Sequence, residues 1–157
     1  IFIDDPTDFK GNFYSFNDVS FQPKPIQKHL PVWMGGNHEK AIQRSIDYAD
    51  GWQPIWFSSD ELEIKMKYLK QYAEEKERNL DNFSISLRNR IRITQKSDKN
   101  SEHPPTALIG EKNEVYDKIL SYRRLDIKEV VLDFITPDKE EIIETLEMLG
   151  NELIPEL

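Results

Sequence analysis

Cysteine is absent from the 157-residue sequence, and histidine is scarce. The missing thiols exclude cysteine nucleophiles, disulfides and thiolate metal sites from this chain. The three histidines, His29, His38 and His103, stand far apart without the i, i+4 pairing that helical metal sites use. We therefore expect no metal site. No apolar run approaches the roughly 18 residues that a membrane-spanning helix requires, so no membrane partner is expected either.

Basic residues are also fewer than acidic ones. The sequence carries 21 basic against 29 acidic side chains, which gives a formal net charge of −8 at pH 7. A chain this acidic repels nucleic-acid phosphates unless its basic residues gather on one surface, and no basic cluster of that kind is found. A hydrophobic content of 38% with 11% aromatics indicates a folded domain rather than a disordered chain. We expect a small-molecule substrate and no nucleic acid.

Residues 1–28 lack the regular pattern of the remaining sequence. Asp4–Pro6 and Lys10–Asn12 have the composition of turns. The aromatic and branched side chains between and after them predict short strands or a hairpin: Phe13, Tyr14, Phe16, Val19 and Phe21. We interpret this segment as an excursion that packs over a larger body.

From Pro31 onward, apolar runs alternate with helical patterns. The predicted strands are residues 32–34, 51–57, 83–93 and 130–132. The predicted helices follow an Asn37 N-cap, a Ser58–Glu61 capping box, Glu111 and Thr136–Pro137. The second helix, with the apolar stripe Leu62, Met66, Leu69 and Ala73, is expected to end near Asn79, and residues 95–106 to form a polar loop.

This alternation predicts an α/β fold in which parallel strands are joined by helical crossovers. Four strand–helix units fit either a small open sheet or the second half of a (β/α)8 barrel. A complete barrel needs roughly 250 residues. Because the sequence starts at Ile1 rather than at methionine, we favour the half-barrel, with four further units upstream. Residues 1–157 are then the C-terminal part of one barrel domain, which includes the 1–28 hairpin segment.

Gly35-Gly36 stands between the first apolar strand and the first helix. Paired glycines at this point leave backbone N–H groups bare at the positive end of a helix dipole, which favours binding of a phosphate group. The alternative is a tight turn without a ligand, because a lone glycine pair is a weak motif. Asp50–Trp52 is interpreted as structural: Gly51 can end the helix and Trp52 enters the next strand.

Two further groups of side chains stand out on the predicted strands. Trp52, Pro54 and Trp56 share a strand face, where they either pack in the core or flank a ring ligand. The third strand carries three arginines on one face, although a covered barrel strand should be apolar throughout: Arg88, Arg90 and Arg92. We expect them to form salt bridges; the alternative is an anionic ligand such as a polyglutamate-like tail.

Four segments in order resemble the luciferase-like monooxygenase superfamily, especially its deazaflavin-dependent branch. They are GNFYSFNDVSFQPKPIQ at Gly11–Gln27, LPVWMGG at Leu30–Gly36, YADGW at Tyr48–Trp52 and the stretch Leu108–Phe134. The resemblance corresponds to the C-terminal half of such proteins. It implies a (β/α)8 barrel that binds FMN or the deazaflavin coenzyme F420 at the carboxyl ends of its strands.

The resemblance also implies where the cofactor is held. Its phosphate maps onto Gly35 and Gly36, with Asn37 and Lys40 as side-chain donors; some members have a hydroxyl residue near the position of Lys40. No catalytic residue is nominated, because the ring contacts are expected upstream of Ile1. We expect a cytoplasmic oxidoreductase or monooxygenase that is a homodimer at full length. The alternatives are a non-catalytic barrel relative and an open α/β module that binds a phosphorylated metabolite.

Overall fold

The computed structural model describes residues 6–94, 104, 106–127 and 129–156. The chain divides into two compact units, residues 1–32 and 33–157, which are considered separately. In the first unit, β1 (Thr7–Lys10) and β2 (Ser15–Val19) form an antiparallel pair. Phe9 lies opposite Phe16, and their rings stack with centroids 5.5 Å apart. The predicted hairpin is therefore confirmed.

The second unit alternates strands and helices. In chain order its elements are β3 (Trp33–Gly35), α1 (Glu39–Tyr48), β4 (Gly51–Gln53), α2 (Ser59–Glu75), β5 (Ser84–Ile93), β6 (Leu108–Gly110), α3 (Lys112–Arg123), β7 (Glu129–Phe134), α4 (Lys139–Met148), the π-helical turn η1 (Leu149–Leu153) and the 3-10 turn η2 (Ile154–Glu156). The four predicted strands and four predicted helices are all present.

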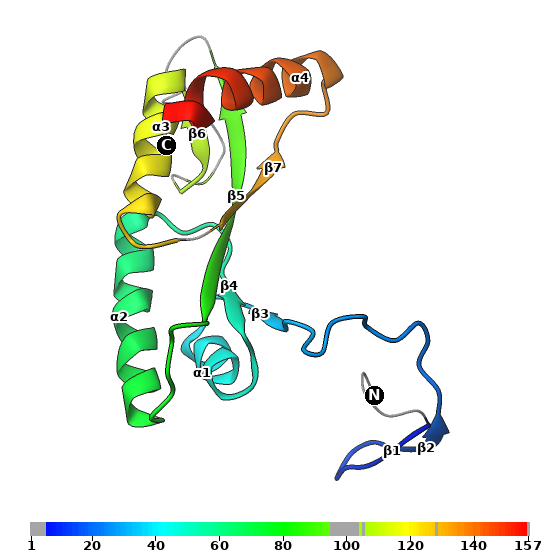
Figure 1. The fold of residues 1–157 in the computed structure, drawn as a ribbon. Helices are drawn as coiled ribbons and strands as arrows, with labels where there is room; N and C mark the ends of the chain where they lie inside the picture. Colours follow the sequence, from blue (N-terminus) through cyan, green and yellow to red (C-terminus); the bar gives the residue numbers. More distant parts are fainter. Residues whose placement is uncertain (1–5, 95–103, 105, 128, 157) are drawn as a thin grey trace. The chain divides into compact units, whose positions relative to one another are not determined.

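All strands of this unit run parallel. β3 pairs with β4, β4 with β5, and β5 with both β6 and β7. The long strand β5 is the centre of the sheet, since β7 pairs with six of its residues (Figure 1). The short strand β6, which pairs with the last three residues of β5, was not predicted. Three residues are too few to show a strand period in the sequence.

Strand β4 is shorter than predicted. It ends at Gln53, and a single bridge between Ile55 and Arg88 continues the pairing. Pro54 has no N–H group to donate to a ladder, and Trp56 leaves the strand conformation with a φ of 56°. Consequently Trp56 does not share a strand face with Trp52: Trp52 and Pro54 are buried, whereas Trp56 is 38% exposed.

The core lies between one face of β5 and the helices α2 and α3, which lie on the same side of this strand in Figure 1. The predicted stripe on α2 is confirmed, with Leu62, Met66, Leu69 and Ala73 all buried. They meet Ile85, Leu87 and Ile91 of β5 together with Val115 and Tyr122 of α3. Burial of this many apolar side chains is the main stabilising contribution to the unit.

Helix α2 begins as predicted and ends earlier than predicted. The Ser58–Glu61 capping box is present, and the Ser58 backbone N–H donates to the Glu61 carboxylate, which lowers the Glu61 pKa. The helix ends at Glu75, not near Asn79. The Arg78 N–H donates to the Ala73 carbonyl around Glu77, whose φ is 51°. This is a Schellman ending, and it was missed because glutamate occupies the position that usually holds glycine.

Helix α4 starts two residues beyond the predicted Thr136–Pro137 signal, with Asp138 as its N-cap. The apolar residues near the end of the chain, which the sequence predicts to point inward from this helix, are only partly buried. Leu149 and Leu153 are buried in η1, whereas Ile143 and Leu146 are exposed. The buried residue of α4 is Thr145. The face that this helix turns toward the core is therefore not the face that carries Ile143 and Leu146.

A buried polar network joins α3 to the sheet. The Tyr122 hydroxyl donates to the Phe57 carbonyl at 2.7 Å and accepts from the Asn89 side chain at 3.0 Å. Asn89, which is fully buried on β5, also donates to the Thr106 carbonyl at 2.8 Å. Burial raises the pKa of Tyr122 to about 12, against the hydrogen bond from Asn89, which lowers it. The neutral phenol therefore belongs to the folded state.

We expect Tyr122→Phe to lower the free energy of unfolding at pH 8 by about 1–3 kcal/mol, because the Phe57 carbonyl loses its donor. Folding raises the pKa of this phenol from about 10 to about 12. Its contribution to stability is therefore fully present at pH values below 10 and is lost as the pH rises toward 12. The difference between wild type and variant should therefore shrink from pH 10 to pH 12. Urea unfolding across this range measures it, with the exposed Tyr48→Phe as control. A constant difference up to pH 12 would contradict the prediction.

Candidate functional site

The connection between β3 and α1 places two glycines at the carboxyl end of a parallel strand. Gly35 is the last residue of β3, and Gly36 has a φ of 116°. A Cβ atom on Gly36 would lie 2.9 Å from the Cβ of Ala41 in the first turn of α1. Both the backbone angle and this close approach therefore require glycine at position 36. The two glycines are exposed, so their backbone is accessible to a ligand.

The buried Trp52 fixes the direction of the peptide that follows Gly36. Its indole Nε1–H donates to the Gly36 carbonyl at 2.8 Å, and its side chain is fully buried. In a planar trans peptide the N–H group points opposite to the carbonyl. The Asn37 N–H is therefore directed away from Trp52. The Asp50–Trp52 segment is structural, as predicted, and its tryptophan also orients the glycine turn.

Asn37 is not the N-cap of α1, so that prediction is wrong. The N-cap is His38, whose side chain makes no capping hydrogen bond. The Asn37 side chain instead accepts from the Ile55 N–H at 3.0 Å and donates to the Ile55 carbonyl at 2.9 Å. These backbone groups lie beyond the end of β4, where Pro54 interrupts the strand. Asn37 thereby attaches the glycine turn to the residue before Trp56.

The first turn of α1 completes the candidate site. The Ala41 N–H donates to the His38 carbonyl at 2.8 Å, and the N–H groups before it precede the first bond of the helix. Lys40 is exposed in this turn and adds a positive charge, while Glu39 adds a negative one, 3.9 Å from Lys65. Gly35, Gly36, Asn37 and Lys40 thus lie on one continuous turn. The Asn37 side chain is hydrogen-bonded to Ile55, so Asn37 contributes its backbone N–H to this site.

Gly51 opens β4, as the predicted strand 51–57 requires, but it does not end the first helix itself. Helix α1 ends at Tyr48 with Ala49 as its C-cap. A Cβ atom on Gly51 would lie 2.8 Å from the Ser84 carbonyl oxygen and 2.8 Å from the Trp33 ring. The glycine therefore permits close packing of β4 against β5 and Trp33.

The three arginines of β5 lie on its polar face, opposite the buried core residues. Arg88 donates to Asp133 of β7 at 2.8 and 3.0 Å, and this ion pair raises the Arg88 pKa. Arg92 donates to Glu141 of α4 at 2.7 and 3.3 Å, and the bond lowers the Glu141 pKa. The salt bridges expected from the sequence are confirmed for these two. The Arg90 guanidinium lies over the Trp56 ring, 4.3 Å from its centroid.

Comparison with known proteins identifies the family. A family model described as luciferase-like monooxygenase matches residues 1–103. The chain belongs to this family. No curated protein matches its sequence.

Three solved structures show the fold of this luciferase-like chain. An F420-dependent secondary alcohol dehydrogenase, solved with an F420–acetone adduct, has a TM-score of 0.78 at 15% identity over 97% of this chain and 56% of its own. A coenzyme F420-dependent tetrahydromethanopterin reductase from Methanopyrus kandleri has a TM-score of 0.75 at 16% identity, and the match covers 97% of this chain and 58% of the reductase. A monooxygenase from Streptomyces bottropensis has a TM-score of 0.73 at 13% identity, and the match covers 99% of this chain and 57% of the monooxygenase.

The luciferase-like chain therefore spans a little more than half the length of these structures. The predicted α/β architecture, half of a (β/α)8 barrel preceded by a hairpin, is confirmed. In parallel α/β folds, ligands bind at the carboxyl ends of the strands. Gly35 ends β3 and Gly36 follows it, so both lie at that edge.

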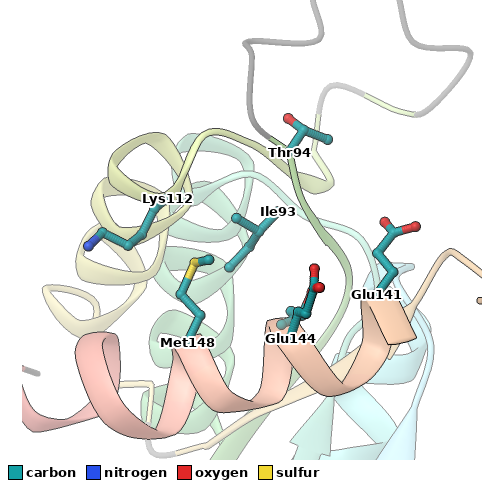
Figure 2. A pocket seen from close by; sticks show the side chains of 7 residues that line it. Ile93, Thr94, Lys112, Glu141, Glu144 and Met148 are labelled. Atoms are coloured by element: carbon teal, nitrogen blue, oxygen red, sulfur yellow. The ribbon is translucent and has the colours of Figure 1, made fainter. Parts of the chain in front are cut away.

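A cavity of the luciferase-like chain, which the sequence did not indicate, lies where β5 ends. It has a volume of about 220 Å³, and Figure 2 shows Ile93 and Met148 pointing toward one another across it. Lys112, Glu141 and Glu144 add charged groups to its lining. No sequence pattern predicts that α4 lies beside the end of β5, because the two elements are far apart in the sequence and meet only in the folded chain.

Neither a metal centre nor a membrane span is found in the described part of this luciferase-like chain. Within residues 6–94, 104, 106–127 and 129–156, no group of three histidine, aspartate or glutamate side chains could hold a metal ion. Over the same residues, every helix is too short or too polar to cross a bilayer. Of the three histidines, His103 falls outside the described residues.

Proposed function

We propose that this chain supplies the cofactor-phosphate site of a flavin-type oxidoreductase. The Gly35–Lys40 turn is the site, and FMN or coenzyme F420 is the cofactor. The observation that supports it best is the hydrogen bond from Trp52 to the Gly36 carbonyl, since it directs the Asn37 N–H away from the buried Trp52, at the start of a helix. Gly36 leaves open the space that a side chain would fill.

The electrostatics of the turn also suit a phosphate. The exposed N–H groups lie at the positive end of the α1 dipole, and the Lys40 ammonium is in the same turn. Glu39 opposes an anion, but its side chain is exposed and lies near Lys65. When bound, a flavin-type cofactor supplies hydride transfer or oxygen activation, while the protein binds and orients it. Two of the similar structures are F420-dependent enzymes, and a third is a monooxygenase.

The proposal is tested by comparing each cofactor with an analogue that lacks the phosphate; in the F420 pair the analogue also lacks the groups attached beyond the phosphate. The intact protein is titrated with FMN and riboflavin, and with F420 and its phosphate-free deazariboflavin, while the ring fluorescence is followed. For one of the two pairs, we expect the phosphorylated form to bind at least about tenfold tighter, because charge-assisted bonds to the turn are lost without it. Equal binding within both pairs would contradict the phosphate site. No binding of any of the four would contradict the oxidoreductase function.

A further inference from the structure

Arg90 differs from the two arginines beside it on β5. Arg88 and Arg92 each make a bidentate ion pair with a carboxylate, Asp133 and Glu141 respectively. Within the part of the chain that the structure describes, the Arg90 guanidinium has no carboxylate partner, although Asp133 lies opposite Arg90 in the strand register. Asp133 directs both its oxygens to Arg88 instead. The charge of Arg90 is thus available on the polar face of the sheet.

Trp56 holds this guanidinium in place. The indole centroid lies 4.3 Å from the Arg90 Cζ atom, a cation–π contact. Trp56 has a φ of 56°, a strained conformation for a bulky residue, and such strain is concentrated at functional sites. Its N–H donates to the Arg88 carbonyl at 3.0 Å, and the preceding Ile55 is held on both its backbone groups by Asn37. Several contacts therefore maintain a costly conformation that places an aromatic ring against Arg90.

We propose that Arg90, positioned by Trp56, binds the anionic group of a small-molecule ligand, either a carboxylate or a phosphate. The planar fork of the guanidinium matches both groups with two parallel hydrogen bonds. Stacking on Trp56 restricts the side chain before the ligand arrives, so less conformational freedom is lost on binding. The indole, 38% exposed, offers an apolar surface beside the charge. A ligand that joins an aromatic ring to an anionic group fits this combination.

The residues of this site differ from those of the phosphate-binding turn, and the proposal does not depend on the proposed cofactor. The two are connected through Asn37, which belongs to the glycine turn and holds the residue before Trp56. Gly36→Asp should strongly weaken binding at the turn and leave Arg90 able to bind its anion. The two proposals can then fail independently.

The test is calorimetric titration of the intact protein with benzoate, phenyl phosphate and benzamide, which share a ring and differ in charge. We expect one of the two anions to bind and benzamide, the uncharged analogue of benzoate, not to bind; the anion that binds more tightly identifies the group. Arg90→Gln should weaken this binding at least about tenfold, and Arg90→Lys less, because lysine keeps the charge without the fork. Arg92→Gln is the matched control on the same face: it leaves the Arg88–Asp133 ion pair intact and should change the binding less than about twofold.

Several results would overturn the proposal. One is equal binding of benzamide and benzoate, and another is an equal loss in Arg92→Gln and Arg90→Gln, which would indicate a general charge effect. Loss of the benzoate site in Gly36→Asp would show that it is not separate from the turn. If Arg90→Gln does not fold, as judged by thermal unfolding, unchanged binding in Arg90→Lys decides against the site. A flat benzoate and phenyl phosphate titration also overturns it and leaves the comparison of FMN with riboflavin unaffected.

Discussion

Trp52→Ala is expected to lower the free energy of unfolding by about 3–5 kcal/mol, the largest stability effect expected from this structure. Trp52 is fully buried, and its ring packs against Phe57 with centroids 6.4 Å apart. Truncation removes the apolar area and leaves a cavity that the parallel strands around it cannot close. It also removes the only donor shown for the Gly36 carbonyl among the described residues. Urea unfolding of the intact protein, followed by circular dichroism, measures the change.

Two variants separate the causes of this loss. Trp33→Ala removes the same side chain at a position that is 38% exposed, so it should cost clearly less. Trp52→Phe keeps most of the apolar volume and removes the N–H donor, and we expect a cost of about 1–2 kcal/mol. Trp52→Phe should in addition weaken cofactor binding, because the peptide between Gly36 and Asn37 is no longer oriented. A Trp52→Ala protein as stable as wild type would contradict the role assigned to this residue.

Gly36→Asp is expected to weaken binding of the phosphorylated cofactor by a factor of about 100 or more. Three physical causes act together. The φ of 116° is unfavourable for any side chain, a Cβ atom would lie 2.9 Å from Ala41, and the new carboxylate would repel the phosphate. Titration with FMN and F420, followed by ring fluorescence, measures the effect. The affinity for riboflavin, which has no phosphate, should change far less.

Matched variants identify which cause dominates. Gly36→Ala introduces the strain and the Cβ atom without the charge, so the difference between it and Gly36→Asp reports the electrostatic contribution. Gly150→Asp adds the same charge at a glycine whose Cβ would meet no atom within 4 Å. It should leave cofactor affinity unchanged. If Gly36→Asp binds FMN and F420 as tightly as wild type does, the phosphate does not lie at this turn.

The position of the glycine turn in the fold was predictable from the sequence, and the contacts within it were not. Gly35 and Gly36 were predictable because the turn between a strand and a helix is encoded by neighbouring residues. Asn37 was assigned to the helix cap because asparagine commonly caps a helix. Its actual partner is the backbone of Ile55, 18 residues away, which offers both a donor and an acceptor. Only the folded chain brings these groups together.

For the arginines of β5 too, the sequence predicted their position but not their individual contacts. Their alternation with apolar residues correctly placed them on one face, and salt bridges were the expected consequence. Nothing in the sequence distinguishes Arg90 from Arg88 and Arg92. The distinction arises from the register of β7, the position of α4 and the turn of Trp56 out of its strand. These are properties of neighbouring elements rather than of β5 itself.

The sequence by itself determined the order of strands and helices apart from β6, the buried stripe of α2, its capping box and the glycine turn. Each of these depends on residues within a few positions of one another, so local periodicity and backbone preference suffice. The tertiary structure alone decided the direction of the Asn37 N–H, the pairing of β6 and the cation–π contact of Arg90. These depend on hydrogen bonds and packing between segments far apart in the chain, such as Trp52 with Gly36. The candidate site is therefore located by local signals and shaped by distant ones.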